Sequence, residues 1–168
     1  MNALPQTFDP ASGDTRAFRA ALGQFGTGVT VVTCATADGP LGITANSFSS
    51  VSLDPPLVLW SPAKSSSRYP FFAAASHFAI HVIAADQFDL AADFARSGDA
   101  FGAHDWEDGA HGVPLLANCL ARFECSQEAL HDAGDHSIVV GRVSRVAMRD
   151  GVPLLFVGGR YGAFQEAD

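Results

Sequence analysis

Positive charge is scarce in this sequence. Ten lysine and arginine residues stand against 18 aspartate and glutamate residues, which gives a net charge of −8 at pH 7. Proteins that bind nucleic acid or an anionic membrane surface present a basic face. The composition therefore argues against both kinds of partner, and no apolar run approaches the roughly 18 residues of a membrane-spanning helix.

Cysteine is also scarce, and the beginning of the chain lacks the basic and apolar segments of a secretion signal. The three cysteines, Cys34, Cys119 and Cys125, are odd in number and show no spacing typical of a metal site. They are expected to be reduced thiols in a cytoplasmic protein, with Cys34 and Cys125 as small core residues. No nucleophile–base pair and no paired carboxylates are evident either, so the residues indicate no metal centre and no covalent catalysis.

Apolar residues make up 48% of the 168 residues and charged residues 17%, as is typical of one globular domain. Residues 1–13, rich in proline, are predicted to be a loose N-terminal leader, and residues 14–168 the domain. Helices are predicted at 14–25, with Asp14 as its N-cap, at 65–75 and at 86–96. The expected strands are 29–36, 41–46, 47–53, 57–60, 77–84, 115–128, 136–149 and 153–157. Many strands with few helices predict a mainly β protein, an antiparallel barrel with helical plugs.

The only lysine of the chain, Lys64, lies where the second helix is predicted to begin, and Arg68 follows it by four residues. A helix start offers free backbone N–H groups, and the hydroxyls of Ser65 and Ser66 would add donors. Together these groups could bind a phosphate. A capped surface helix with solvated cations is the alternative explanation.

Small polar side chains are frequent in the two strands expected at 41–46 and 47–53. In strand geometry Thr44, Asn46, Phe48, Ser50 and Ser52 share one face. Such a face suits a planar heteroaromatic ligand, although a solvent-exposed sheet face is an ordinary place for these residues. The order along the chain favours the ligand, because a polar strand, a short buried strand and a phosphate-like helix start match the ring, sugar and phosphate of a nucleotide-like cofactor.

These segments resemble the short-chain flavin reductases, the reductase components of two-component flavin-dependent monooxygenases. The resemblance is carried by residues 25–33, 42–48 (Gly-Ile-Thr-Ala-Asn-Ser-Phe), 50–57 (Ser-Val-Ser-Leu-Asp-Pro-Pro-Leu), 64–66, 94–95, 123–125, 134–136 and 159–162. It implies an antiparallel split β-barrel of the Greek-key type that binds FMN or FAD, usually as a homodimer.

The resemblance also implies roles for individual residues. The flavin ring and ribityl chain would contact Thr44, Ala45, Asn46 and Ser47, with Ser50, Val51 and Ser52 lining the same pocket. The phosphate region would be held by Ser61, Lys64, Ser65 and Ser66, and the loop over the flavin would carry Phe94, Arg96 and Phe101. The nicotinamide donor would dock at His136 and at Gly159, Arg160, Tyr161 and Gly162.

Several of these residues have simpler explanations. His136 could pair with its neighbour Asp135, Arg160 with an acidic loop, and Tyr161 could fill the core. His81 stands in a strand where family members often have asparagine, and is expected to be a hydrogen-bonded barrel residue. The family's loop often reads Asp-Lys-Phe, whereas residues 99–101 read Asp-Ala-Phe here, so one positive contact to the flavin is expected to be absent.

The resemblance implies an enzyme that transfers a hydride from NADH, or alternatively NADPH, to FMN or FAD and supplies reduced flavin to a partner monooxygenase. The cofactors carry such chemistry and the protein aligns them, so the lack of a nucleophile–base pair is no objection. Two alternatives remain open: a non-enzymatic flavin-binding or electron-carrier protein, and a flavin-dependent oxidase or monooxygenase on the same barrel.

Overall fold

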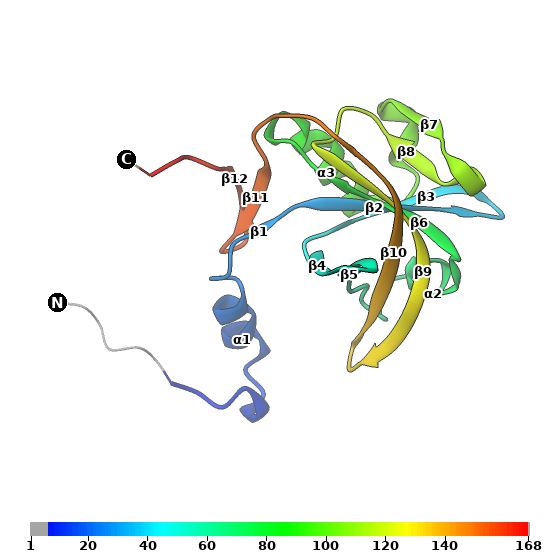
Figure 1. The fold of residues 1–168 in the computed structure, drawn as a ribbon. Coiled ribbons are helices and arrows are strands. Elements are labelled where there is room, and N and C mark those ends of the chain that lie inside the picture. Colours follow the sequence, from blue (N-terminus) through cyan, green and yellow to red (C-terminus); the bar gives the residue numbers. More distant parts are fainter. Residues whose placement is uncertain (1–6, 168) are drawn as a thin grey trace.

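The computed structural model describes residues 7–167, and strands make up most of its regular structure (Figure 1). The helices are α1 (Thr15–Leu22), α2 (Tyr69–Ala74) and α3 (Phe88–Arg96), with short 3-10 turns at Pro10–Ser12, Ala85–Gln87, Ala100–Ala103 and Ala110–Gly112. The strands are β1 (Thr27–Gly28), β2 (Thr30–Thr36), β3 (Gly39–Ala45), β4 (Ser49–Leu53), β5 (Pro56–Trp60), β6 (His77–Val82), β7 (Trp106–Asp108), β8 (Pro114–Leu116), β9 (Ala121–Ala133), β10 (His136–Met148), β11 (Leu154–Val157) and β12 (Arg160–Ala163).

Seven strands form one antiparallel sheet in the order β3-β2-β6-β9-β10-β5-β4. Its two edge strands, β3 and β4, follow one another in the chain and are separated by residues 46–48 alone. A segment of that length spans at most about 14 Å. The sheet therefore curls until its edges nearly meet, without closing into a complete barrel. The prediction of a mainly β, antiparallel protein with few short helices is confirmed.

Strand β2 is buried on both faces of this curled sheet. Val31 belongs to the apolar cluster beneath α3, whereas the next residue, Val32, belongs to the cluster inside the curl with Trp60 and Phe78. Successive side chains of a strand point to opposite faces, so a strand covered on both sides is buried along its length. The buried hydroxyls of Thr30 and Thr33 donate to the carbonyl oxygens of Ala45 and Pro114. Cys34 also lies in the inner cluster, and its thiol is buried as expected.

Helix α3 packs tightly against β3. A Cβ atom at Gly42 would lie 2.5 Å from the ring of Phe94, so only glycine allows the helix to come this close. The guanidinium of Arg68 holds the two elements together, since it donates to the carbonyl oxygens of Gly42 at 3.1 Å, Phe94 at 2.7 Å and Ala95 at 3.2 Å. An arginine at the last carbonyls of a helix satisfies groups that would otherwise lack partners.

Some predicted boundaries are wrong. The helix expected at 65–75 begins only at Tyr69, because Ser65–Arg68 form turns. The strand expected at 115–128 is two strands, β8 and β9, because Asn118 adopts the left-handed conformation with φ of 57° and turns the chain. Between residues 96 and 115, where neither a helix nor a strand is predicted, the structure has β7, which pairs with β8.

The chain ends lie to one side of the large sheet. Strands β1, β11 and β12 form a small separate sheet, and α1 stands beyond it (Figure 1). Asp14 caps α1 as predicted, since its carboxylate accepts the N–H of Ala17 at 2.9 Å. Part of the predicted leader, residues 1–6, lies outside the described residues. Within residues 7–167, none of the helices is long and apolar enough to cross a membrane.

Candidate functional site

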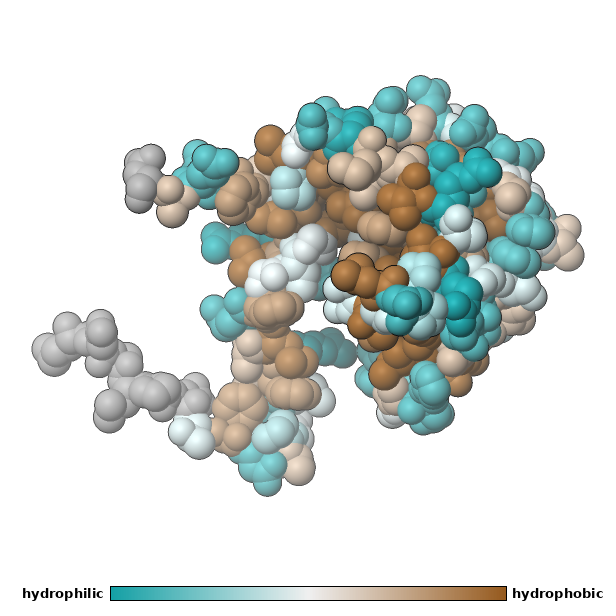
Figure 2. All heavy atoms as spheres, viewed as in Figure 1, coloured by the Kyte–Doolittle hydropathy of each residue, from teal (hydrophilic) through white to brown (hydrophobic). Residues whose placement is uncertain are grey.

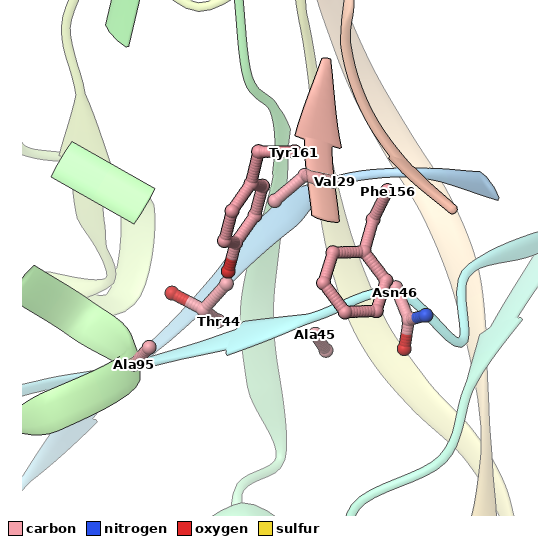
Figure 3. A pocket seen from close by; sticks show the side chains of 7 residues that line it. All are labelled: Val29, Thr44, Ala45, Asn46, Ala95, Phe156 and Tyr161. Carbon is pink, nitrogen blue, oxygen red and sulfur yellow. The ribbon is translucent and has the colours of Figure 1, made fainter. Parts of the chain in front are cut away.

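Two adjoining cavities open where the edges of the large sheet approach each other. The larger has a volume of about 410 Å³ and the smaller about 150 Å³, and both are lined by Thr44, Ala45 and Asn46. The larger cavity is also lined by Ile43, Ser47, Trp60, Ser61, Pro62, Ala63 and His136. The smaller cavity, shown in Figure 3, is also lined by Val29, Ala95, Phe156 and Tyr161.

The cavities run along the free backbone edge of β3. The N–H of Gly42 donates away from β2 to the carbonyl of Gly98 at 2.9 Å, whereas the carbonyl of Ala45 faces β2 and accepts the hydroxyl of Thr30 at 2.7 Å. The backbone N–H and C=O groups of successive residues in a strand point alternately to its two sides. The groups of Thr44 and Asn46 therefore point away from β2, as those of Gly42 do. An edge strand with such groups offers donors and acceptors to a ligand.

The hydroxyls of the polar strand have backbone partners. Thr44 donates to the carbonyl of Ala91 in α3 at 2.6 Å. The hydroxyl oxygen of Ser47 accepts the N–H of Ser61 at 2.9 Å, which joins the 46–48 link to the end of β5. Asn46 is exposed, and its side-chain amide has no hydrogen-bond partner within the described part of the chain. Of these polar side chains, the amide of Asn46 is available to a ligand.

Two aromatic rings from the small sheet cover the smaller cavity. Tyr161 descends from β12 with its hydroxyl toward Thr44, and the ring of Phe156 lies beside Asn46 (Figure 3). The two rings contact each other with centroids 5.1 Å apart. Tyr161 was predicted as a site residue, but Phe156 was not. A four-residue apolar strand carries no signal for which of its side chains faces a cavity.

The tip of the β9–β10 hairpin forms the other end of the larger cavity. His136 lines the cavity and forms an isolated β-bridge with Ala63. Its Nδ1 atom lies 2.8 Å from the carboxylate of Asp135, and this hydrogen bond lowers the pKa of the Asp135 carboxyl. The pairing of His136 with its neighbour is therefore confirmed, and because the residue also lines the cavity, docking of the nicotinamide donor there stays a prediction.

Lys64 follows the cavity wall directly and is already bound to the same hairpin. Its Nζ atom lies 2.6 Å from the Asp132 carboxylate and 2.6 Å from the carbonyl oxygen of Gly134. Hydrogen bonding to Lys64 lowers the pKa of Asp132. Ser65 and Ser66 lie in a turn and do not line the cavities, and the expectation that they begin a helix is wrong.

Several predicted site residues lie elsewhere. Ser50, Val51 and Ser52 are on the outer edge strand β4, where Ser50 and Val51 are exposed. Phe94 and Phe101 are core residues whose rings meet edge to face with centroids 4.8 Å apart. Arg96 is exposed and pairs with Asp93 at 2.9 Å. Gly159, Arg160 and Gly162 belong to the exposed β11–β12 hairpin and do not line the cavities.

His81, a residue outside the cavities, behaves as predicted. Its ring is fully buried and accepts the N–H of Leu116 on Nε2 at 3.1 Å, so the proton is on Nδ1, which donates to the carbonyl of Val31 at 3.0 Å. Burial lowers the pKa of this imidazole to about 4. It is thus a neutral structural residue in β6 that is hydrogen-bonded to β2 and to β8.

Comparison with known proteins identifies the family. A family model described as "Flavin reductase like domain" matches residues 22–165. The chain belongs to this family. It is 62% identical to "FMN reductase (NADH) SmoA" of Agrobacterium fabrum over 157 residues, 94% of this chain and 90% of that protein. It is 41% identical to "Flavin-dependent monooxygenase, reductase subunit HsaB" of Rhodococcus jostii over 150 residues, 88% of this chain and 77% of that protein.

A solved structure of the family shares the fold. "Streptomyces globisporus C-1027 NADH:FAD oxidoreductase SgcE6 in complex with NAD and FAD fragments" superposes with a TM-score of 0.90 at 40% identity, covering 98% of this chain and all of that one. The resemblance read from the sequence is therefore confirmed.

The cavities of this flavin reductase family member fit a flavin. The larger cavity, of about 410 Å³, is in the range of about 300–1,000 Å³ that is usual for small-molecule sites, and the smaller cavity adjoins it. An isoalloxazine ring needs apolar faces and polar edges. The rings of Trp60, Phe156 and Tyr161 offer the former, and the free backbone groups of Thr44 and Asn46 offer the latter.

Proposed function

We propose that this protein is an NADH-dependent flavin reductase, which transfers a hydride from the nicotinamide of NADH to FMN or FAD. With one proton from solvent, the products are NAD⁺ and reduced flavin. The observation that carries the proposal is the cavity pair along the free edge of β3, in a chain that belongs to the flavin reductase family. The flavin, when bound, supplies the electron acceptor, and the protein supplies binding, orientation and exclusion of water.

In this proposal the flavin ring lies along the β3 edge. The backbone groups of Thr44 and Asn46 bind its polar edge, with Ala45 beneath it. Ser47 and Ser61 line the path of the ribityl chain toward Lys64, which binds the phosphate. Ser65 and Ser66 are close to Lys64 in the sequence, and they remain predicted phosphate contacts.

The nicotinamide donor would approach the exposed face of the ring. Tyr161 and His136 are the predicted donor residues that line the cavities, the first at the ring end and the second at the hairpin end. A tyrosine ring can stack on a nicotinamide, and a neutral imidazole can donate a hydrogen bond to its amide or to a phosphate.

Consumption of NADH tests this function directly. Purified protein with NADH and either FMN or FAD should lower the absorbance at 340 nm, and omission of the flavin should stop the reaction. An electron carrier would bind flavin without NADH bleaching its absorbance. An oxidase or monooxygenase would take up oxygen only with a particular organic substrate. Absence of flavin-dependent NADH oxidation with both flavins would contradict the proposal.

The reduced flavin is proposed to leave the protein and to serve a partner oxygenase. Support comes from the relatives of this chain, among them the reductase subunit of a flavin-dependent monooxygenase. A cytoplasmic location is part of the proposal, because the reaction draws on NADH and the three cysteines form no disulfide within the described residues. A partner that hydroxylates its substrate only when this reductase, NADH and flavin are all present would support it.

We also propose that the protein is a homodimer to which α1 contributes. Helix α1 buries no residue in its own chain, and Phe18, Leu22 and Phe25 are exposed. Figure 2 shows this apolar surface on the segment that stands apart from the strands. An isolated helix of eight residues is marginal in water, so α1 needs a covering surface. Since no other part of the described chain covers it, a second copy is the proposed partner.

Size-exclusion chromatography with light scattering tests the dimer. Phe18→Ser should shift the protein toward the monomer, because it removes apolar surface from α1. Phe71→Ser is the matched control, because Phe71 on α2 has the same exposed fraction, 43%, as Phe18. A monomeric parent protein, or equal effects of the two changes, would count against this interface.

A further inference from the structure

The side chains of Lys64 and His136, at the hairpin end of the site, already have hydrogen-bond partners. Lys64 binds the carboxylate of Asp132 and the carbonyl of Gly134, both at 2.6 Å. His136 pairs with Asp135 through Nδ1. Arg68, four residues after Lys64, is engaged elsewhere, because it donates to three backbone carbonyl oxygens where α3 ends against β3. A phosphate that enters this end of the cavity therefore meets a lysine that is already paired with a carboxylate.

The pairing of Lys64 with the hairpin is built into the backbone as well. The N–H of Lys64 donates to the carbonyl of Asp135 at 2.9 Å, and the N–H of Ser137 donates to the carbonyl of Pro62 at 3.1 Å. These bonds hold the cavity wall against the hairpin whether or not the lysine side chain is engaged. The side chain of Lys64 can therefore change partners without the wall moving.

Asp132 lies where its ion pair with Lys64 can break at little cost in free energy. Its side chain is 82% exposed, whereas that of Lys64 is 31% exposed. A carboxylate released from this pair would be hydrated at once and would leave no buried charge behind. A phosphate monoester carries about −1.5 to −2 charges at pH 7, more than one carboxylate, and can take its place on Lys64.

We infer that Asp132 competes with the flavin phosphate for Lys64, and that this competition limits how tightly a phosphorylated flavin is held. The inference rests on the proposed function, in which Lys64 binds the phosphate. Binding replaces the Lys64–Asp132 ion pair by a lysine–phosphate pair, and release restores it. The reduced flavin has to leave this reductase. Re-formation of the Lys64–Asp132 ion pair lowers the free-energy cost of breaking the lysine–phosphate pair, and so favours release.

The test compares dissociation constants for FMN and for riboflavin, which has no phosphate, at low ionic strength. Asp132→Asn should tighten FMN binding by roughly two- to fivefold, the scale of one exposed ion pair, and leave riboflavin binding unchanged. Added salt should reduce the gain. Asp132→Glu should restore the parent values. Unchanged riboflavin binding also reports that each variant is folded.

Glu128→Gln is the matched control. It removes one negative charge from the same strand, where Glu128 pairs with Arg142 at 2.7 Å and not with Lys64. If Glu128→Gln tightens FMN binding as much as Asp132→Asn does, the effect is one of net charge and the inference is wrong. Equal tightening of FMN and riboflavin by Asp132→Asn would also overturn it.

Lys64→Ala separates this inference from the proposed function. Weaker FMN binding with unchanged riboflavin binding supports Lys64 as the phosphate ligand, and adding Asp132→Asn to that variant should then change nothing. If Lys64→Ala affects both flavins equally, the phosphate role of Lys64 in the proposed function fails. If Lys64→Ala is selective for FMN but Asp132→Asn has no effect in the parent protein, only the competition inference fails.

Discussion

The hydroxyl oxygen of Ser47 accepts a hydrogen bond from the backbone N–H of Ser61 at 2.9 Å, and the same hydroxyl donates to the carbonyl oxygen of Ser61 at 3.3 Å. This side chain connects the short link between the two sheet edges to the end of β5. It thereby fixes the wall of the larger cavity. Ser47, which the sequence suggests as a ligand contact, therefore also stabilises the fold at this point.

Ser47→Ala should loosen this wall. The change removes both hydrogen bonds to Ser61, and the loss of a hydrogen bond of this kind costs about 1 kcal/mol of unfolding free energy. Urea denaturation should show that loss, and flavin binding should weaken. Ser49→Ala is the matched control, because the exposed hydroxyl of Ser49 bonds only to the carbonyl of its neighbour Ser50. Equal losses in the two variants would contradict a special role for Ser47.

Gly42→Ala should push α3 away from β3. The new methyl group would sit 2.5 Å from the Phe94 ring, and overpacking of this kind typically costs about 1–3 kcal/mol. Thermal and urea unfolding would measure the loss. Adding Phe94→Leu should recover part of it. Gly28→Ala is the control, since a Cβ there meets no atom within 4 Å and should change the unfolding free energy little.

His81 should make the folded state less stable in mild acid. Its pKa is about 4 when folded and about 6.5 when unfolded, so between these values the unfolded chain binds more protons. The unfolding free energy contributed by His81 therefore falls as the pH is lowered from 6.5 toward 4, by about 1.4 kcal/mol for each pH unit.

His81→Asn should remove this dependence. Between pH 7 and pH 5 the variant should lose about 2 kcal/mol less unfolding free energy than the parent protein, whatever its stability at pH 7. Urea unfolding at both pH values measures the difference. A parent-like slope in His81→Asn would show that its ring is not the titrating group.

Tyr161→Ala should raise the KM for NADH by roughly three- to tenfold, the effect of losing one aromatic stacking contact. Tyr161→Phe should retain most of that contact and distinguishes the ring from the hydroxyl. Phe164→Ala removes another exposed ring near the same end of the chain and serves as the control. Steady-state kinetics with flavin held constant gives the comparison. An unchanged KM for NADH in Tyr161→Ala would remove Tyr161 from the donor site.

Local sequence patterns predicted the fold class and the centre of the candidate site. Alternation and β-branched residues gave the strands, and the cap of α1 at Asp14 was predicted correctly. Thr44 and Ser47 could be singled out because hydroxyls in a half-buried strand need partners. These signals depend on neighbours in the chain, so one sequence is enough to read them.

The remaining errors come from contacts between distant segments. Sequence spacing does not show that Phe94 turns into the core against Gly42, or that Phe156 reaches the cavity from another sheet. Arg68 was considered as a phosphate ligand, but its guanidinium lies where α3 ends against β3. The position of Lys64 depends on the hairpin formed 70 residues later, whose Gly134 carbonyl accepts its ammonium.

The free edge of β3 has a consequence for measurement. The backbone amide protons of Thr44 and Asn46 point away from the neighbouring strand, whereas that of Ala45 faces it. In the empty protein the two outward amides should exchange with deuterium faster than the inward one, and a bound ring should slow them selectively. The exchange rates of the Thr44 and Asn46 amides would therefore report whether a ligand is bound, and the rate of the Ala45 amide would serve as the internal reference. No label has to be introduced near the cavity.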